Sequence, residues 1–184
     1  MDNFGFDPWA RNPMFVTGEN VAKENGITRE EQDALALVRY EQYMDALADD
    51  RAFQKRYMPA CEVNPSGRKV LGVVETDEGV FPTTAEGLAK LRPVAKDGTI
   101  TFGSQTHPAD GNAGLIVANK AMADEFSADK GVTIQVLSAG QYRTKKGSMA
   151  AAVVPAAQMA CERAGVDVKD GVNWSRSIEF PNPV

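Results

Sequence analysis

The stretch Val16–Glu30 constrains the fold more than any other part of this chain, because it contains the end of one helix and the start of the next. Val16–Asn25 has a helical pattern and is followed by Gly26, which lacks a Cβ and can adopt the left-handed conformation that ends helices. Thr28 and Glu31 then have the spacing of a capping box, in which each side chain bonds a backbone N–H at the start of the new helix. The sequence therefore predicts two helices joined by a tight turn.

The rest of the chain alternates predicted helices with predicted strands. Apolar residues at helical spacing predict helices at Arg29–Asp49, Thr84–Lys90, Ala121–Phe126 and Met149–Ala164. Runs of β-branched residues between turn-forming residues predict strands at Val70–Val74, Val132–Ala139 and Val172–Phe180. This order of elements is typical of a mixed α/β fold.

Some of these segments carry more detailed expectations. Thr83 and Glu86 have the spacing of a second capping box. The continuous apolar run Val132–Ala139 predicts a strand covered on both faces. Pro155 is compatible with its helix if it occupies the first helical position. The small apolar residues of Ala113–Ala118 predict a buried segment, either strand or helix.

The N-terminal segment, residues 1–14, is predicted to be irregular, because Gly5, Pro8 and Pro13 oppose a helix. It is nevertheless rich in aromatic side chains, which need a cover. This combination indicates a chain that belongs to a larger fold or docks onto a partner.

Composition excludes several classes of function. The net charge is −5, and the basic residues cluster only at Arg143, Lys145 and Lys146, so nucleic-acid binding is not expected. The two cysteines, Cys61 and Cys161, are too far apart in sequence for a metal-binding motif. No apolar run reaches the length of a membrane span, and no secretory signal is visible. We expect a cytoplasmic protein with free thiols and no membrane contact.

The loop Thr99–Gly111 is the best candidate for ligand binding. Ser104, Gln105 and Thr106 supply two hydroxyls and an amide, and the glycines beside them permit close backbone approach. Such a loop suits an amide-bearing chain such as pantetheine, although ordinary turns have the same composition. His107 in this loop is interpreted as structural or solvated, because no base or nucleophile is visible beside it.

Three stretches together resemble the thiolase family. Glu19–Ala22 with Gly26–Asp33 is similar to the helical part of the thiolase loop domain, and Leu88–Pro93 with Asp97–Thr101 is similar to the return into the core. Ala109–Gly114 most resembles thiolases that work with a small partner protein, of the archaeal and aromatic- or steroid-degrading types.

The resemblance implies an incomplete thiolase-like α/β fold, with loop-domain helices plus a mixed sheet with flanking helices. Residues 1–84 would form a loop-domain-like helical region with a short strand, and residues 85–184 a core-like α/β region. The implied reaction is Claisen condensation or thiolysis of coenzyme A thioesters, with the thioester as substrate and no cofactor. The family's nucleophilic cysteine would lie before residue 1 and its later catalytic segments after residue 184, so we expect an inactive isolated chain.

The resemblance also implies site residues. Thr106 stands where the family touches the pantetheine of coenzyme A, with Ser104 and Gln105 beside it. Met14 matches the hydrophobic residue that follows the loop-domain histidine. Asn182 resembles the catalytic asparagine that holds a water near the thioester oxygen.

Two other interpretations stay open. The chain is alternatively a non-catalytic binding or assembly subunit of a split thiolase-like complex, which its aromatic N-terminal segment favours. A further interpretation is a free-standing α/β domain, and this interpretation predicts a cooperatively unfolding monomer. The incomplete-thiolase interpretation and the split-complex interpretation both predict association with the remaining thiolase segments or a partner subunit, in a homo- or hetero-oligomer.

Overall fold

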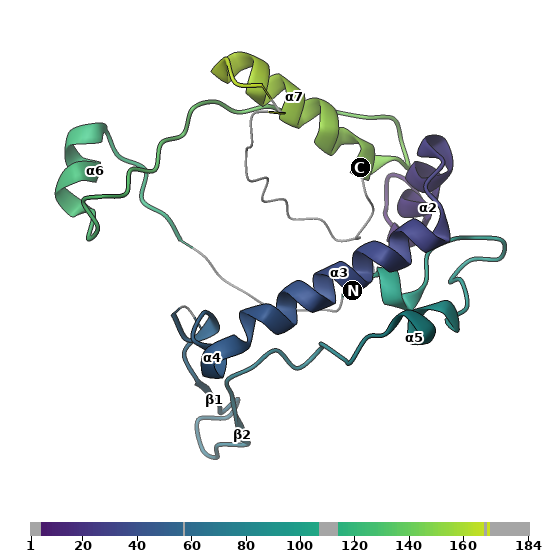
Figure 1. Ribbon diagram of the computed structural model, residues 1–184, viewed down its shortest axis with the longest axis horizontal. Helices are drawn as coiled ribbons and strands as arrows, with labels where there is room; N and C mark the ends of the chain where they lie inside the picture. The colour runs from purple at the N-terminus through teal and green to yellow at the C-terminus, as the bar shows by residue number, and fades with distance from the viewer. Residues whose placement is uncertain (1–4, 57, 107–113, 168, 170–184) are drawn as a thin grey trace. The chain divides into compact units, whose positions relative to one another are not determined.

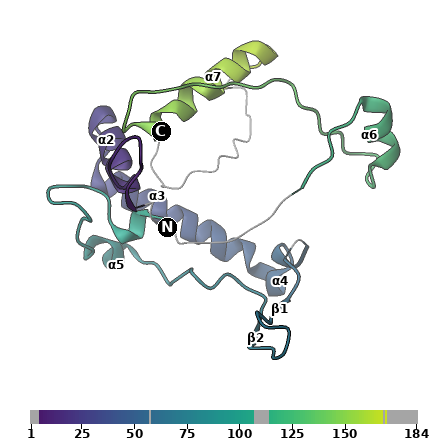
Figure 2. The same ribbon diagram turned by 180° about the vertical axis from the view of Figure 1, so that it is seen from behind.

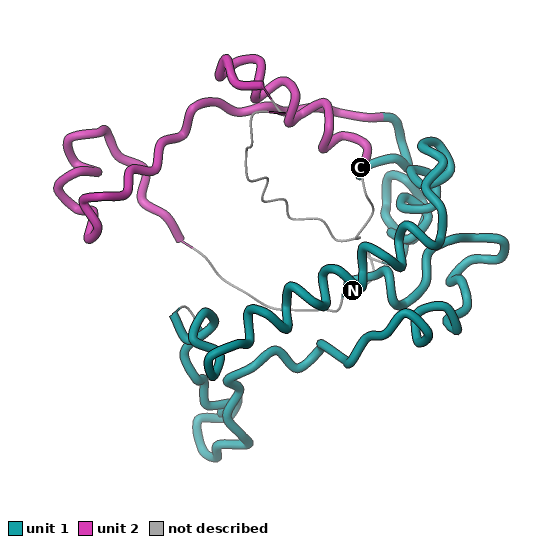
Figure 3. Tube along the Cα trace, viewed as in Figure 1, with its two compact units in different colours: residues 1–108, 145–150, 176–184 teal, residues 109–144, 151–175 magenta. Residues whose placement is uncertain are grey.

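The computed structural model describes residues 5–56, 58–106, 114–167 and 169 (Figure 1). The chain divides into two compact units (Figure 3). Unit 1 contains residues 1–108, 145–150 and 176–184, and unit 2 contains residues 109–144 and 151–175.

The two predicted N-terminal helices are confirmed in unit 1. Helix α2 spans Met14–Asn25, and Gly26 ends it in the left-handed conformation with φ 67°. Helix α3 spans Arg29–Ala46, and the capping box of Thr28 and Glu31 is present with both of its hydrogen bonds. The local chemistry of the glycine and the cap therefore fixes this turn, as the sequence indicates.

The second helix ends at Ala46, earlier than the predicted Asp49. Asp49 and Asp50 have φ of 52° and 54°, a left-handed conformation that interrupts the regular helix. The short elements α4 (Ala48–Arg51) and η1 (Gln54–Arg56) follow.

The described part of unit 1 contains one hairpin, and the sequence predicted only its second strand. Strands β1 (Cys61–Val63) and β2 (Gly72–Val74) are antiparallel, with Cys61 opposite Val74 and Val63 opposite Gly72. The second strand lies within the predicted Val70–Val74. The first was missed because its three residues are too short a run to show an alternating pattern.

The next helix, α5 (Ala85–Ala89), corrects the predicted capping box. Its N-cap is Thr84, whose hydroxyl accepts a hydrogen bond from the Gly87 N–H at 3.1 Å. The Thr83 hydroxyl instead donates to the carbonyl of Phe81 at 3.0 Å. Two adjacent threonines offer the same cap, and the sequence pattern alone selected the wrong one.

The core of unit 1 is small and lies where α2, α3 and α5 meet the segment around Ile100. Its buried apolar residues are Val21, Ala22, Ile27, Leu88 and Ile100. Helices α3 and α5 lie side by side in both views of the ribbon (Figures 1 and 2), and η2 (Phe102–Ser104) also packs against α3.

Residues 145–150 belong to this unit and lie against α2. The Asn20 amide donates to the carbonyl of Gly147 at 2.7 Å, and Lys145 pairs with Glu24 at 2.5 Å. Lys146 lies over the ring of Trp9, 5.7 Å from its centroid. Lys145 and Lys146 of the basic cluster therefore contact the N-terminal part of the chain.

The described part of unit 2 contains two regular helices, α6 (Lys120–Phe126) and α7 (Val153–Ala164), and a 3₁₀ turn, η3 (Met149–Ala152), leads into α7. Pro155 is the third residue of α7 and not the first, the position at which the sequence pattern would make it compatible with the helix. It is tolerated because N–H groups in a helix's first turn have no intrahelical partner. Gly165 ends α7 in the left-handed conformation, with φ 68°.

The predicted strand Val132–Ala139 is absent, and so is regular structure in residues 114–118. The Ile134 and Ile116 side chains are 91% and 88% exposed, so neither segment is buried as predicted. In the described part of the chain no strand lies beside either segment, and a strand needs a neighbour to pair its backbone groups. Ala113 and the predicted strand Val172–Phe180 lie outside the described residues.

The exposed apolar side chains of unit 2 lead to a testable expectation. We expect the purified chain to bind a hydrophobic dye such as anilinonaphthalene sulfonate, because Leu115, Ile116, Ile134 and Val136 are all more than 75% exposed. The double variant Ile116→Ser, Ile134→Ser is expected to reduce dye fluorescence measurably. A dye-silent, sharply unfolding monomer would contradict this and favour a free-standing domain.

Candidate functional site

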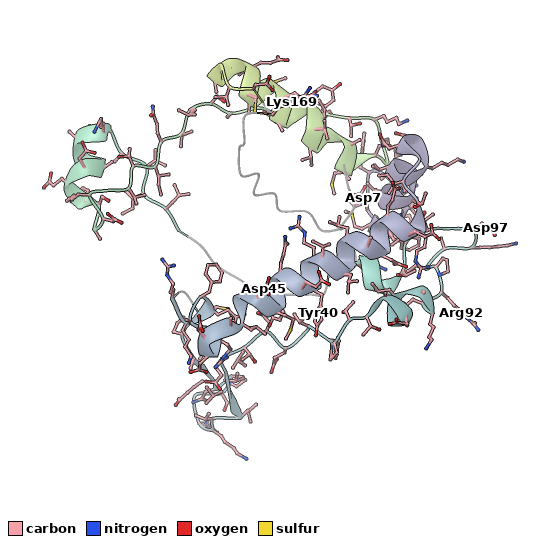
Figure 4. All side chains as sticks on the ribbon, in the orientation of Figure 1. Asp7, Tyr40, Asp45, Arg92, Asp97 and Lys169 are labelled. Atoms are coloured by element: carbon pink, nitrogen blue, oxygen red, sulfur yellow. The ribbon has the colours of Figure 1, made fainter. Side chains whose placement is uncertain are left out.

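The candidate ligand loop begins at a segment that is held by a carboxylate from α2. Glu19 accepts hydrogen bonds from the backbone N–H of Thr99 at 2.9 and 3.0 Å and from that of Ile100 at 2.8 Å. The chain reaches this point through a tight turn in which Asp97, labelled in Figure 4, has φ 59°. Charge-assisted bonds of this kind are about twice as strong as neutral ones, so Glu19 is the main anchor of the segment.

The same segment is tied to α3 through a threonine hydroxyl. The Thr99 hydroxyl donates to Glu19 Oε2 at 3.1 Å and accepts from Gln32 Nε2 at 2.9 Å. Gln32 is fully buried, so its hydrogen bond to Thr99 lies inside the protein. Thr99 therefore joins two helices to the start of the loop.

The 3₁₀ turn η2 closes on itself through Thr101 and Ser104. The Thr101 hydroxyl accepts from the Gly103 N–H at 3.1 Å. The Ser104 hydroxyl accepts from the Thr101 N–H at 3.0 Å and donates to the Thr101 carbonyl at 3.3 Å. Ser104 is only 2% exposed, so its hydroxyl serves the loop's own conformation.

The two residues that follow are more accessible. Gln105 is half-buried, and its amide donates to the Thr101 carbonyl at 3.1 Å. Thr106 is exposed and is the last described residue before the gap at 107–113. The structure therefore separates a supporting group, Ser104, from two groups at the surface of the loop.

Helix α5 and the residues just after it also support the loop. Arg29 of α3 donates to the carbonyls of Leu88 and Leu91 at 2.6 and 3.3 Å, and its Nε pairs with Asp33 at 2.6 Å. A Cβ at Gly103 would lie 2.4 Å from Leu88 Cδ2 and 2.8 Å from Leu91 Cδ1. The loop therefore rests closely on the end of α5.

Met14 and Asn182 complete the predicted site. Met14 is the half-buried first residue of α2, the helix that also carries Glu19. Asn182 and His107 lie outside the described residues.

The cysteines are not in settings that favour nucleophilic chemistry. Cys61 is exposed in β1, and Cys161 is half-buried inside α7. Neither lies at a helix N-terminus, where a thiolate is stabilised. Among the described residues, no group of three or more histidine, cysteine, aspartate or glutamate side chains could hold a metal ion.

A second polar cluster joins the end of α3 to the segment after the hairpin. Gln54 is 5% exposed and donates to Asp77 at 2.9 Å. Burial, followed by the neighbouring Asp77 charge, raises the pKa of the Tyr43 phenol above its usual 10.0. Asp77 therefore ties the segment after the hairpin to the residues that follow α3.

Glu19 and Gln32 were also not singled out as site residues from the sequence. One signal was available for Gln32: it lies one turn before Leu35 on the α3 row that also contains Val38. A polar residue on a helix row of this kind needs a buried partner.

The comparisons with known proteins agree with this architecture. The family described as "Thiolase, N-terminal domain" matches residues 6–121. The mouse protein named "3-ketoacyl-CoA thiolase B, peroxisomal" is 37% identical over 164 residues, which is 86% of this chain and 38% of that protein. Beta-ketothiolase BktB of Cupriavidus necator is 35% identical over 169 residues, covering 89% of this chain and 41% of that protein.

Solved structures give the same result. The acetyl-CoA acetyltransferase of Bacillus anthracis superposes with a TM-score of 0.75 at 28% identity, covering 90% of this chain and 41% of that one. Human mitochondrial 3-ketoacyl-CoA thiolase superposes with a TM-score of 0.72 at 31% identity and the same coverages. The chain belongs to the thiolase family, and it spans 38–41% of the length of the relatives named here.

These findings confirm the predicted thiolase-like, incomplete α/β fold. The resemblance to partner-dependent thiolases and the domain boundary at residue 84 stay predictions. None of the helices in the described part of the chain combines the length and the apolar character needed to cross a bilayer.

Proposed function

We propose that this chain contributes the coenzyme A-facing loop of a thiolase-like acyltransferase that acts on coenzyme A thioesters, by Claisen condensation or thiolysis. The observation that carries the proposal is the loop 99–106, which Glu19, Gln32 and η2 hold in one conformation inside the family-matched region. The thioester is the substrate, and we propose no cofactor.

The loop suits the pantetheine arm because that arm carries amides that need hydrogen-bond partners. We assign the direct contacts to Thr106 and Gln105, which lie at the accessible end of the loop. Ser104 contributes by fixing η2, since both roles of its hydroxyl are used by Thr101. Met14 supplies apolar contact to the arm, and Asn182 remains our proposed contributor to the thioester oxygen's environment.

The direct test is the variant Thr106→Val. We expect coenzyme A to bind it about 0.5–1.5 kcal/mol more weakly, the net value of one neutral hydrogen bond, with the fold preserved because the side chains are nearly isosteric. Calorimetric titration of both forms measures the difference, with Thr28→Val, at the N-cap of α3, as the matched control. Equal affinities for wild type and Thr106→Val would leave Thr106 as an ordinary turn residue.

We also propose that the isolated chain has no thiolase activity, because neither Cys61 nor Cys161 occupies a setting that favours a thiolate. We expect no thiolysis of acetoacetyl-coenzyme A above the rate without protein. Turnover that disappears in Cys61→Ala or Cys161→Ala would overturn this expectation.

The second candidate is a non-catalytic assembly subunit of a split thiolase-like complex. The exposed apolar side chains of residues 115–117 and 132–137 favour it, since such surface is typically covered in a complex. Under either candidate, we propose that the remaining thiolase segments or a partner subunit bind this chain in an oligomer, in the cytoplasm. Purification from the native source, with mass spectrometry of the bound chains, distinguishes the two candidates. If the segments that carry the reactive cysteines are found on a separate polypeptide, the assembly-subunit candidate is favoured.

A further inference from the structure

Residues 101–106 follow directly on the segment that hydrogen bonds from α2 and α3 hold in place. Gln32 of α3 and Glu19 of α2 make these hydrogen bonds to Thr99 and Ile100, at the start of the loop. The position of the loop therefore depends on groups outside it.

Thr99 occupies the central place in this arrangement. Its hydroxyl has a defined direction, because Gln32 can only donate to it through Nε2 and Glu19 can only accept from it. The hydroxyl thus completes a continuous path from α3 through Thr99 to α2. Both neighbouring groups lose a partner when it is removed.

A short path connects Thr99 to the ligand-facing end. Ile100 is 1% exposed, and its carbonyl accepts from the Val94 N–H at 2.8 Å, which fixes the backbone beyond Thr99. Thr101 follows directly, and its carbonyl accepts from both the Ser104 hydroxyl and the Gln105 amide. Thr99 therefore lies two residues before the carbonyl that orients Gln105.

We propose that Thr99 is a positioning residue for coenzyme A binding, acting through its hydroxyl between Gln32 and Glu19. The inference rests on the proposed function of the loop, and it assigns the loop's orientation to a hydroxyl that does not itself touch the ligand.

The test compares Thr99→Val with Thr99→Ser in the full chain. The valine variant keeps the shape and both backbone bonds to Glu19 but removes the hydroxyl, whereas the serine variant retains it. We expect coenzyme A to bind Thr99→Val about three- to tenfold more weakly than wild type, and Thr99→Ser within about twofold of wild type. Calorimetric titration with coenzyme A gives the affinities.

Two further measurements separate positioning from general stability. Thr28→Ala removes the cap of α3 without touching the loop, and we expect it to leave coenzyme A affinity within about twofold. Amide exchange, measured without ligand, is expected to accelerate at Gly103 and Ser104 in Thr99→Val and not in Thr99→Ser. Should Thr99→Val fail to fold, Gln32→Met removes the donor to the same hydroxyl and is expected to act in the same direction.

The outcomes distinguish this inference from the proposed function. If wild type and Thr106→Val bind coenzyme A differently but Thr99→Val binds like wild type, the positioning role is wrong and the loop's function stands. If the wild-type chain does not bind coenzyme A at all, the proposed function fails, and the inference fails with it. Unchanged amide exchange in Thr99→Val overturns the positioning role in either case. If Thr28→Ala and Thr99→Val weaken coenzyme A binding equally, the effect of Thr99→Val reflects general stability and the positioning role is wrong.

Discussion

Replacing Glu19 by alanine is expected to lower the free energy of unfolding of unit 1 by about 2–4 kcal/mol, a large share of what a small unit possesses. The carboxylate accepts from the N–H groups of Thr99 and Ile100 and from the Thr99 hydroxyl. Ile100 is buried, so alanine leaves its N–H without a partner in a place that water does not reach readily. Urea unfolding followed by circular dichroism measures the change.

Glu24→Ala is the matched control, because it makes the same substitution on the same helix. Glu24 pairs with Lys145 at 2.5 Å, but their side chains are 39% and 67% exposed. An ion pair this exposed contributes at most about 1 kcal/mol. Equal effects of the two substitutions would mean that Glu19 is not the anchor of residues 99–100.

Introducing a side chain at Gly140 is expected to be the most damaging small substitution in unit 2. A Cβ there would lie 1.9 Å from the carbonyl oxygen of Ala156 and 2.9 Å from the N–H nitrogen of Ala160. These neighbours are backbone atoms of α7 and cannot rotate away as a flexible side chain could. We expect Gly140→Ala to cost about 3 kcal/mol, the upper end for overpacking.

The damage would extend to the neighbouring contacts with α7. The Ser138 hydroxyl donates to the Ala160 carbonyl at 2.5 Å, and Arg163 donates to the Ala139 carbonyl at 2.6 Å. Amide exchange of α7 is therefore expected to accelerate in Gly140→Ala. Gly114→Ala is the control, since a Cβ there meets nothing within 4 Å and is expected to change stability by less than about 0.5 kcal/mol. Unchanged α7 protection in Gly140→Ala would show that this close contact is absent in solution.

Local chemistry explains which parts of the fold were predictable. The turn between α2 and α3 depends on Gly26 and Thr28, whose conformational preferences act within a few residues. Gly165 ends α7 for the same reason. Thr83 and Thr84 mark the limit of such prediction, because Thr83 has the capping-box spacing to Glu86 and yet Thr84 is the N-cap.

The incorrect or missed sequence predictions concern features that depend on residues distant in the sequence. The residues of Val132–Ala139 favour a strand, but a preference does not supply the neighbouring strand that its backbone groups require. Similarly, Glu19 and Thr99 are 80 positions apart, and no local pattern indicates their contact. The sequence located the loop around Ser104, whereas the inward use of its hydroxyl became visible only once the loop was folded.

Hydrogen–deuterium exchange of the chain with and without coenzyme A tests most directly whether the loop ending at Thr106 faces coenzyme A. We expect the ligand to slow exchange at Gly103, Ser104 and Gln105, while the hairpin Cys61–Val74 exchanges at an unchanged rate. Slowed exchange confined to other segments, or no change at 103–105 at saturating coenzyme A, would contradict the assignment of this loop.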